Sequence, residues 1–342
     1  MDYTKYATDK AMEILAIDSP TGYTQKAVEW LVTQLKSFGY NPKITAKGGV
    51  LADLGGSSEK GLMLTAHTDT LGGMVAEIKD NGRIRLTNIG GLNANNCETE
   101  NVKIYTRNDK IFEGTFQLCN ASVHVNKEYG KTERTFDSCE VVLDHDVKSK
   151  KDAIELGINV GDIVAFDPRS HVTSDGYIKS RFLDDKLSVG IILAFAKMIS
   201  DKKVELKQKT YAHFTVFEEV GHGCSASIPS EVDEILAIDM GCVGNGLNCT
   251  EKDCSICVKD SHGPYNYEMI SRLIEGAKKQ NASYALDVYP LYGSDADAAL
   301  SAGVDAKHAL IGAGVYASHG YERSHVIGVE NTLKTLVGFT CK

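Results

Sequence analysis

Apolar residues near the start of the chain recur at the spacing of one helical face. Val28, Leu31 and Leu35 fall on the same side of a 3.6-residue period. Thr24 precedes them in the position of an N-cap, and Gly39 follows where a helix commonly ends. The pattern therefore predicts an amphipathic helix between Thr24 and Gly39.

Two short apolar runs follow this helix, at residues 50–54 and 62–66. The second run has no polar residue before Thr65, as expected of a strand that helices cover on both faces. The first seventy residues therefore alternate between helix and strand, which is typical of an α/β fold.

From about residue 72 to residue 167 the helical periodicity is scarce and short alternating runs replace it. These runs lie at residues 102–105, 110–112 and 162–166, and turn residues such as Asn108, Gly114 and Gly161 separate them. We expect residues 72–167 to form an inserted β-rich domain. Residues 1–71 and 168–342 would then form one α/β domain in two segments.

The helix-and-strand alternation returns after Ser170. Helices are predicted at 187–199, 267–279 and 329–339, and strands at 213–217 and 235–238.

Composition and charge exclude several classes of function. With 42% apolar residues and a formal net charge of −9, the 342-residue chain has no basic footprint for nucleic acid. Its longest apolar stretch, 189–199, is too short to span a bilayer, and the start of the chain lacks a signal-peptide pattern. The nine cysteines show no disulfide framework, so we expect a cytoplasmic protein with free thiols and without nucleic-acid or membrane partners.

Candidate chemistry gathers at the ends of three predicted strands and at the head of the apolar helix. Open α/β sheets bind ligands just outside the carboxyl ends of their strands, so side chains at these ends should converge. The residues concerned are His67, Asp69, Asp184, Asp185, Glu218, Glu219 and Asp239.

So many carboxylates in one place repel one another unless a cation lies between them. One imidazole with several carboxylates suits Zn²⁺, Co²⁺ or Mn²⁺. Two ions about 3.5–4 Å apart that share one carboxylate are a recurring hydrolytic arrangement.

Each of these residues has a simpler interpretation when it is taken alone. A single histidine such as His67 is more often structural, and Glu218 with Glu219 could form a solvated turn. Asp184 and Asp185 could merely cap the helix that follows them. Their joint placement at successive strand ends favours the metal site.

Several segments, in this order along the chain, resemble the signatures of one known family. They are Ser-Pro-Thr-Gly at 19–22, Ala-His-Thr-Asp at 66–69, Leu-Asp-Asp-Lys at 183–186, Phe-Glu-Glu-Val-Gly at 217–221 and Ala-Ile-Asp-Met at 237–240. Val-Gly-Asp at 160–162 and Gly-Ser-Asp-Ala at 293–296 extend the likeness over nearly the whole chain. The family is that of the glutamyl/deblocking aminopeptidases, tetrahedral two-metal metallopeptidases of which some members are labelled endoglucanases.

The resemblance implies an α/β/α metallopeptidase domain with a small inserted β-barrel domain that mediates dimerisation and assembly. It also implies two divalent ions per subunit (Zn, Co or Mn), with Asp184 bridging them and His67, Glu219 and Asp239 as further ligands. Glu218 would be the general base, and Asp69 would orient the ring of His67.

The stretch 316–325, where the last ligand is expected, departs from the family's usual pattern and contains two candidate histidines. His319 matches by its distance from residues 329–331 and by the Glu322 that follows it. His325 is the competing candidate, and the pattern favours His319.

The cysteines offer two other sites, both weaker. Cys254 and Cys257 have the spacing of half a zinc site, but no second pair completes it. A strand with small buried thiols is the better interpretation there. Cys224 similarly fits packing better than the nucleophile of a cysteine hydrolase.

The resulting hypothesis is a metal-dependent aminopeptidase that acts on short peptides with a free N-terminus. As in the family it resembles, it would be a homo-oligomer, up to a closed twelve-subunit shell. The alternatives are a related two-metal carboxypeptidase or N-acyl-amino-acid deacylase, and a non-enzymatic scaffold that has kept the fold.

Overall fold

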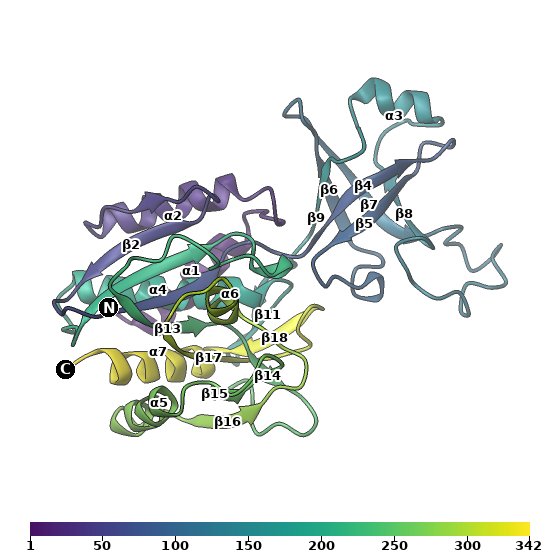
Figure 1. The fold of residues 1–342 in the computed structure, drawn as a ribbon. Helices are drawn as coiled ribbons and strands as arrows, with labels where there is room; N and C mark the ends of the chain where they lie inside the picture. The colour runs from purple at the N-terminus through teal and green to yellow at the C-terminus, as the bar shows by residue number, and fades with distance from the viewer. The chain divides into compact units, whose positions relative to one another are not determined.

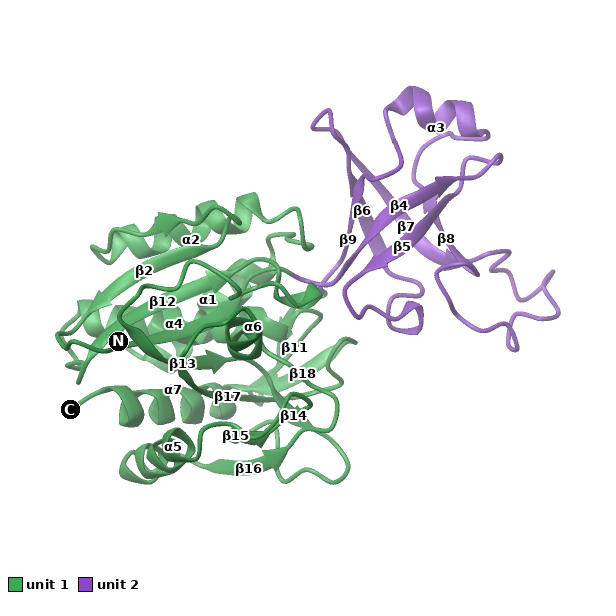
Figure 2. Cartoon of the chain, in the orientation of Figure 1, with its two compact units in different colours: residues 1–69, 169–342 green, residues 70–168 purple.

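A computed structural model describes residues 1–342, and the chain divides into two compact units. Unit 1 comprises residues 1–69 and 169–342, and unit 2 comprises residues 70–168 (Figure 2). No helix is long and apolar enough to cross a membrane.

Unit 1 is built on a large mixed sheet, in which the strand order along the main path is β1-β2-β12-β3-β13-β17-β18-β11-β10 (Figure 1). Strands β14 and β15 also pair with β17, and β16 pairs with β15. The bounds are β1 Lys43–Ile44, β2 Val50–Gly55, β3 Gly61–His67, β10 His171–Val172, β11 Tyr177–Ser180, β12 Lys209–Thr215, β13 Val232–Ile238, β14 Gly241–Val243, β15 Cys254–Lys259, β16 Tyr284–Val288, β17 Lys307–Tyr316 and β18 Glu322–His325.

The centre of this sheet is parallel, and this property positions the candidate site. Strand β3 pairs in parallel with β12 and β13, and β13 pairs in parallel with β17. Their carboxyl ends therefore lie at the same edge of the sheet. Every residue of β3 is buried, which explains its unbroken apolar run.

Helices pack on this sheet through their apolar stripes. Helix α4 lies against β3 and β17, α7 lies against β15 and β17, and α6 contacts β3, β13 and β17. Helix α1 packs on α4, and α5 packs on α7. The bounds are α1 Tyr3–Leu15, α2 Gln25–Ser37, α4 Leu183–Ser200, α5 Tyr267–Lys279, α6 Asp295–Ser301 and α7 Val326–Thr340, with a short 3₁₀ turn η2 at Glu218–Val220.

Unit 2 contains a closed barrel with the strand order β4-β5-β8-β7-β6-β9. Burial alternates along β6 and β7, as the sequence pattern indicates, and the rings of Phe116 and Phe166 meet edge to face inside. The elements are β4 Gly72–Ile78, β5 Ile84–Ile89, η1 Ala94–Asn96, β6 Asn101–Tyr105, β7 Ile111–Leu118, β8 Cys139–Leu143, α3 Lys150–Leu156 and β9 Ile163–Phe166.

The predicted fold class, an α/β domain with a small β-rich barrel, is confirmed. One local boundary was wrong. The strand expected at 213–217 ends at Thr215, because the chain turns at Phe217 into η2. The helix predicted at 187–199 is confirmed, since Asp184 and Asp185 have non-helical dihedral angles and regular helix follows them.

The packing of α4 on α1 requires a glycine at position 190. A Cβ atom there would lie 2.4 Å from the carbonyl oxygen of Ala7, and backbone cannot move aside easily. We expect Gly190→Ala to lower the free energy of unfolding by about 1–3 kcal/mol in a urea titration. Gly244→Ala is the control, because its Cβ would meet nothing within 4 Å. Equal stability of the two variants would contradict this account.

Candidate active site

Asp184 lies between two histidines and directs one carboxylate oxygen at each. Its Oδ1 is 3.0 Å from Nε2 of His67, and its Oδ2 is 3.5 Å from Nε2 of His319. His67 ends β3, whereas His319 lies in the loop between β17 and β18. The fold therefore places one carboxylate between two imidazoles that are 252 residues apart in the chain.

Each histidine lies in a group with Asp184 and one further carboxylate. His67, Asp184 and Asp239 present ligand atoms that lie within 4.8 Å of one another, and so do Asp184, Glu219 and His319. Asp184 belongs to both groups. All five predicted metal ligands are thus brought together, in two sets that share one residue.

The ring of His67 is oriented for such a role. Its Nδ1 lies 2.9 Å from the backbone oxygen of Asp69, and because a carbonyl only accepts, Nδ1 carries the proton. Nε2 therefore faces the carboxylate of Asp184, 3.0 Å away; it donates to that oxygen when protonated and offers its lone pair to a cation when deprotonated.

Asp69 acts on this ring through its backbone rather than through its carboxylate, which differs from the expected contact. The carboxylate accepts hydrogen bonds from the backbone N–H groups of Glu218 and Glu219 and from Oγ1 of Thr21. With these donors in place, its Oδ1 remains 3.7 Å from Nδ1 of His67. Asp69 thereby links the end of β3 to the turn η2.

Glu218 and Glu219 are neighbours in η2 with different surroundings. Glu219 reaches His319, with Oε2 3.7 Å from its Nε2, and its other oxygen is buried without a hydrogen-bond partner. Glu218 belongs to neither ligand group, and its Oε2 lies 3.7 Å from Nε2 of His67. The two side chains can therefore perform different tasks.

Burial and mutual repulsion shift the pKa values of the acids at the site. Burial raises the pKa of Glu218 and Glu219 well above the ordinary value, and that of Asp239 to about 7, and neighbouring carboxylates add to these shifts. Burial also opposes ionisation of Asp184, but its hydrogen bonds with His319 and His67 hold its pKa below the usual range.

Three buried carboxylates that the sequence analysis left without a role hold the backbone around the site. Glu322 accepts the N–H of Asp184 on one oxygen, at 3.1 Å, and the N–H of His319 on the other, at 3.0 Å. Asp185 accepts the N–H of His67. The only signal in the sequence for Glu322 was its position three residues after His319.

The third is Asp295, which connects the two strands that carry the ligands. One of its oxygens accepts from Thr65 in β3 and from Thr215 in β12, each at 2.7 Å. The other accepts the N–H of Cys224. This side chain therefore fixes the ends of β3 and β12 relative to each other.

The donor set fits divalent cations. Imidazole nitrogen and carboxylate oxygen are ligands of Zn²⁺, Co²⁺ and Mn²⁺, and a cation would offset the repulsion among the buried acids. Glu219, a member of the second ligand group, has one buried oxygen without a hydrogen-bond partner, and a cation bound at this group would offset the cost of burying that side chain.

His325, the competing candidate for the last ligand, lies elsewhere. Its Nδ1 accepts the N–H of Ile327 as the N-cap of α7, and its Nε2 lies 2.8 Å from the backbone oxygen of Asp175. Both ring nitrogens are thus engaged with backbone groups.

The cysteines do not form an alternative centre. Sγ of Cys224 lies 3.6 Å from Nδ1 of His213, but burial raises the pKa of this thiol well above its ordinary value. The same burial lowers the pKa of His213 to about 4, so the pair stays neutral and unreactive. Cys254 and Cys257 are buried in β15, and neither belongs to a candidate metal group.

A cleft of about 930 Å³ lies beside the candidate ligands. Asp184, Glu218, Glu219, Asp239 and His319 all line it. This volume can admit an amino-acid side chain together with the adjoining peptide group.

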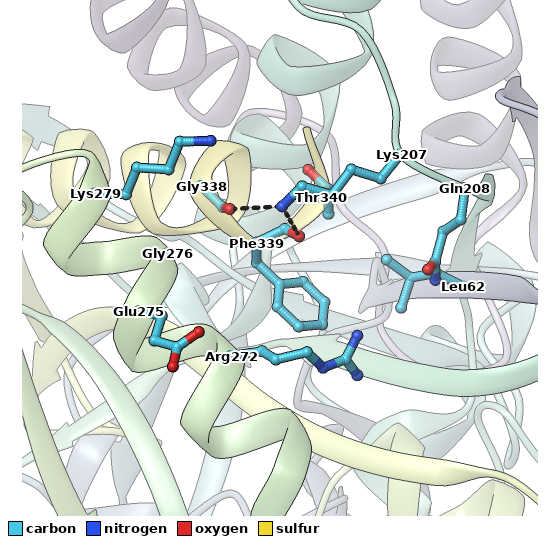
Figure 3. Close-up of a pocket in the computed structure, with 10 residues that line it drawn as sticks. All are labelled: Leu62, Lys207, Gln208, Arg272, Glu275, Gly276, Lys279, Gly338, Phe339 and Thr340. Atoms are coloured by element: carbon cyan, nitrogen blue, oxygen red, sulfur yellow. Dashed lines mark hydrogen bonds between the residues drawn. The ribbon is translucent and has the colours of Figure 1, made fainter. Parts of the chain in front are cut away.

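A second pocket, of about 260 Å³, lies at the opposite end of the strands, near Leu62 at the start of β3 (Figure 3). Figure 3 shows Lys207 donating to the backbone oxygens of Gly338 and Phe339, in the last turn of α7. Lys207 therefore stabilises the C-terminus of α7, which favours positive charge, and Arg272 pairs with Glu234. No histidine or cysteine lines it, so it offers no comparable chemistry.

Comparison with known proteins identifies the family and the fold. The family described as M42 glutamyl aminopeptidase matches residues 48–335. A protein named "Putative aminopeptidase YhfE" from Bacillus subtilis (strain 168) is 44% identical over 325 residues, 95% of this chain and 94% of that one.

Two solved structures share the fold over nearly the full length of both chains. Aminopeptidase APDkam598 from the archaeon Desulfurococcus kamchatkensis has a TM-score of 0.88, 21% identity and coverage of 100% and 96%. The TET1 peptidase of Pyrococcus horikoshii, which can assemble into a tetrahedron or a large octahedral shell, has a TM-score of 0.85, 22% identity and coverage of 98% and 99%. The resemblance noted in the sequence is confirmed.

The two late histidines should differ in their effect on stability. His325→Ala removes the cap of α7, so the free energy of unfolding in chelator-treated protein should fall by about 1 kcal/mol. His319→Asn is the control, since asparagine tolerates the positive φ of that residue, and its effect should stay within about 0.5 kcal/mol. The idea fails if His319→Asn is the more damaging change in a urea titration.

Proposed function

The chain belongs to the M42 glutamyl aminopeptidase family, and we propose that it uses two divalent metal ions to remove N-terminal residues from short peptides. The observation that carries this proposal is the placement of Asp184. A carboxylate with one oxygen toward each of two histidine groups is the arrangement that a shared ligand of two ions requires.

His67 and Asp239 would hold one ion, Glu219 and His319 would hold the other, and Asp184 would bridge them. Zn²⁺, Co²⁺ and Mn²⁺ all suit these ligands. Such a pair of ions polarises the substrate carbonyl and lowers the pKa of water.

Glu218 is the proposed general base. It lines the cleft beside the ligand groups, and its backbone N–H donates to Asp69, which fixes the turn that carries it. From there it can take a proton from the attacking water and return it to the leaving amine. Its neighbour Glu219 is turned toward His319 and serves as a ligand instead.

Asp69 and Glu322 would act on the reaction through the groups they hold. Asp69 fixes the ring of His67 by its carbonyl and the turn η2 by its carboxylate. Glu322 fixes the backbone of Asp184 and His319 together. Both keep the ligands at a spacing that repulsion alone would widen.

We further propose a homo-oligomer assembled through the barrel, up to a closed twelve-subunit shell that would restrict access to short peptides. One support is the exposure of three valines in unit 2, Val123, Val125 and Val160, at 60%, 72% and 67%. The likeness to a self-assembling peptidase points the same way. The nine free cysteines favour a reducing compartment, and we assign the enzyme to the cytoplasm.

The second candidate is a two-metal carboxypeptidase or N-acyl-amino-acid deacylase, which would use the same ligands. The closed barrel in place of a helix-and-sheet lid favours the aminopeptidase.

Metal removal tests the two ions. Dialysis against a chelator should reduce hydrolysis of aminoacyl-p-nitroanilides by at least about 100-fold, and Zn²⁺, Co²⁺ or Mn²⁺ should restore it. Elemental analysis of the restored protein should find two ions per chain. Full activity of metal-free protein would refute the proposal.

Glu218→Gln tests the base separately from the ligands. The amide keeps the shape of the side chain but cannot accept the proton, so kcat should fall by about 10²–10⁴-fold. Elemental analysis should still find two ions, whereas Glu219→Gln, the matched control, should lower the metal content. Turnover retained by Glu218→Gln would remove Glu218 from this role.

Blocking the substrate distinguishes the two candidate activities. An aminopeptidase should cleave a free dipeptide and leave its N-acetylated form intact, because the free amine is part of what it recognises. Preferential release of acetate from N-acetyl-amino acids would favour the deacylase.

A further inference from the structure

The cleft continues well beyond the candidate ligands. Its farther wall is formed by the segments 261–262 and 291–294 and by helix α6. The apolar part of this wall contains Met240, Tyr292 and Ala298, whereas Asp297 is its single carboxylate outside the candidate catalytic group. No lysine or arginine lines any part of the cleft.

The carboxylate of Asp297 is fixed from behind by neutral donors. Its Oδ2 accepts from the N–H of Ser294 at 2.9 Å and from the hydroxyl of the same residue at 3.1 Å. The hydroxyl of Tyr265 donates to Asp260 at 2.8 Å and lies 3.5 Å from Asp297. Two buried acids are therefore joined by one tyrosine.

No lysine or arginine is paired with either acid. The nearest imidazole nitrogens to Asp297 are Nε2 of His308, at 3.7 Å, and Nδ1 of His262, at 4.0 Å. Burial lowers the pKa of His308, which keeps it neutral. Burial and the proximity of Asp260 raise the pKa of Asp297 to about 6, and a cation bound beside the carboxyl group would favour its ionised form.

Gly293 allows the ring of His262 to pack closely against the backbone in this wall. A Cβ atom at Gly293 would lie 2.7 Å from Cε1 of His262, so only glycine leaves room for that ring. The backbone N–H of His262 is in turn held by Asp260 at 2.8 Å. The imidazole and the carboxylate of Asp297 are thus both built into the wall.

We propose that this wall recognises a basic side chain on the N-terminal residue of the substrate, with Asp297 as the specificity-determining carboxylate. The assignment rests on the proposed aminopeptidase function and names its substrate class. The methylene stem of lysine or arginine would lie on the apolar wall, and its cationic end would meet the one charge there.

The same wall should bind an acidic side chain poorly. A glutamate in this position would lose water, meet the charge of Asp297 and find no lysine or arginine to pair with. This member of a family described by glutamyl substrates should therefore be a poor glutamyl aminopeptidase.

Matched substrates separate charge from size. With the metal-loaded enzyme, kcat/KM for lysyl-p-nitroanilide should exceed that for norleucyl-p-nitroanilide, which has a stem of similar length and no charge, by about tenfold. The value for glutamyl-p-nitroanilide should lie about tenfold or more below that for glutaminyl-p-nitroanilide. Ratios near one for both pairs would overturn the proposal.

Asp297→Asn tests the residue. The amide oxygen can still accept from Ser294, so the helix cap is kept while the charge is lost. The lysyl to norleucyl ratio should fall by about tenfold, whereas kcat/KM for norleucyl-p-nitroanilide should change little. Asp305→Asn, which removes the same charge outside the cleft, should leave the ratio unchanged.

The two levels of the proposal fail in different ways. If no aminoacyl substrate is cleaved after metal loading, the proposed function is wrong. If norleucyl and glutamyl substrates are cleaved as well as lysyl ones, the function stands and the role of Asp297 is wrong. An unchanged ratio in correctly folded Asp297→Asn also excludes that role.

Discussion

The catalytic unit depends on the repulsion among acids buried at the carboxyl edge of its sheet. Asp184, Glu218, Glu219 and Asp239 share one end of the cleft, and burial raises the pKa of the last three. Charges this close cannot all be ionised in a low-dielectric site unless something opposes them. Two imidazoles oppose them at Asp184, and the arrangement of the ligand atoms accommodates cations for the rest.

The architecture holds these acids in place with other acids. Asp69, Asp185, Asp295 and Glu322 direct their oxygens at backbone N–H groups next to the ligands. The direction of the ligands is thus set by the loops and strand ends that these acids hold.

The same principle extends from catalysis to selectivity. Ser294, the N-cap of α6, donates to Asp297. The carboxylate in the wall of the cleft is therefore also part of the cap at the start of this helix. Helix α6 begins at Asp295, whose carboxyl group connects β3 and β12. The element that would read the substrate is therefore coupled to the element that positions the ligands. The barrel of unit 2 has its own core, and all of the candidate ligands lie in unit 1.

The sequence by itself determined the α/β class, the β-rich insertion and the set of residues that meet. The reason is local: the apolar run 62–66 predicts a buried strand, and His67 follows it directly. Parallel strands then bring their carboxyl ends together whatever the loops do. Motifs at 183–186 and 217–221 added the remaining acids.

Tertiary structure alone decided what each residue contacts. Periodicity cannot distinguish His319 from His325, since both lie in one short stretch, yet one faces Asp184 and the other caps α7. It also cannot show that Asp69 holds His67 by its carbonyl, or that Glu322 joins two distant backbones. Such contacts depend on long-range packing and on the direction of single side chains, which the spacing of residues along a chain does not encode.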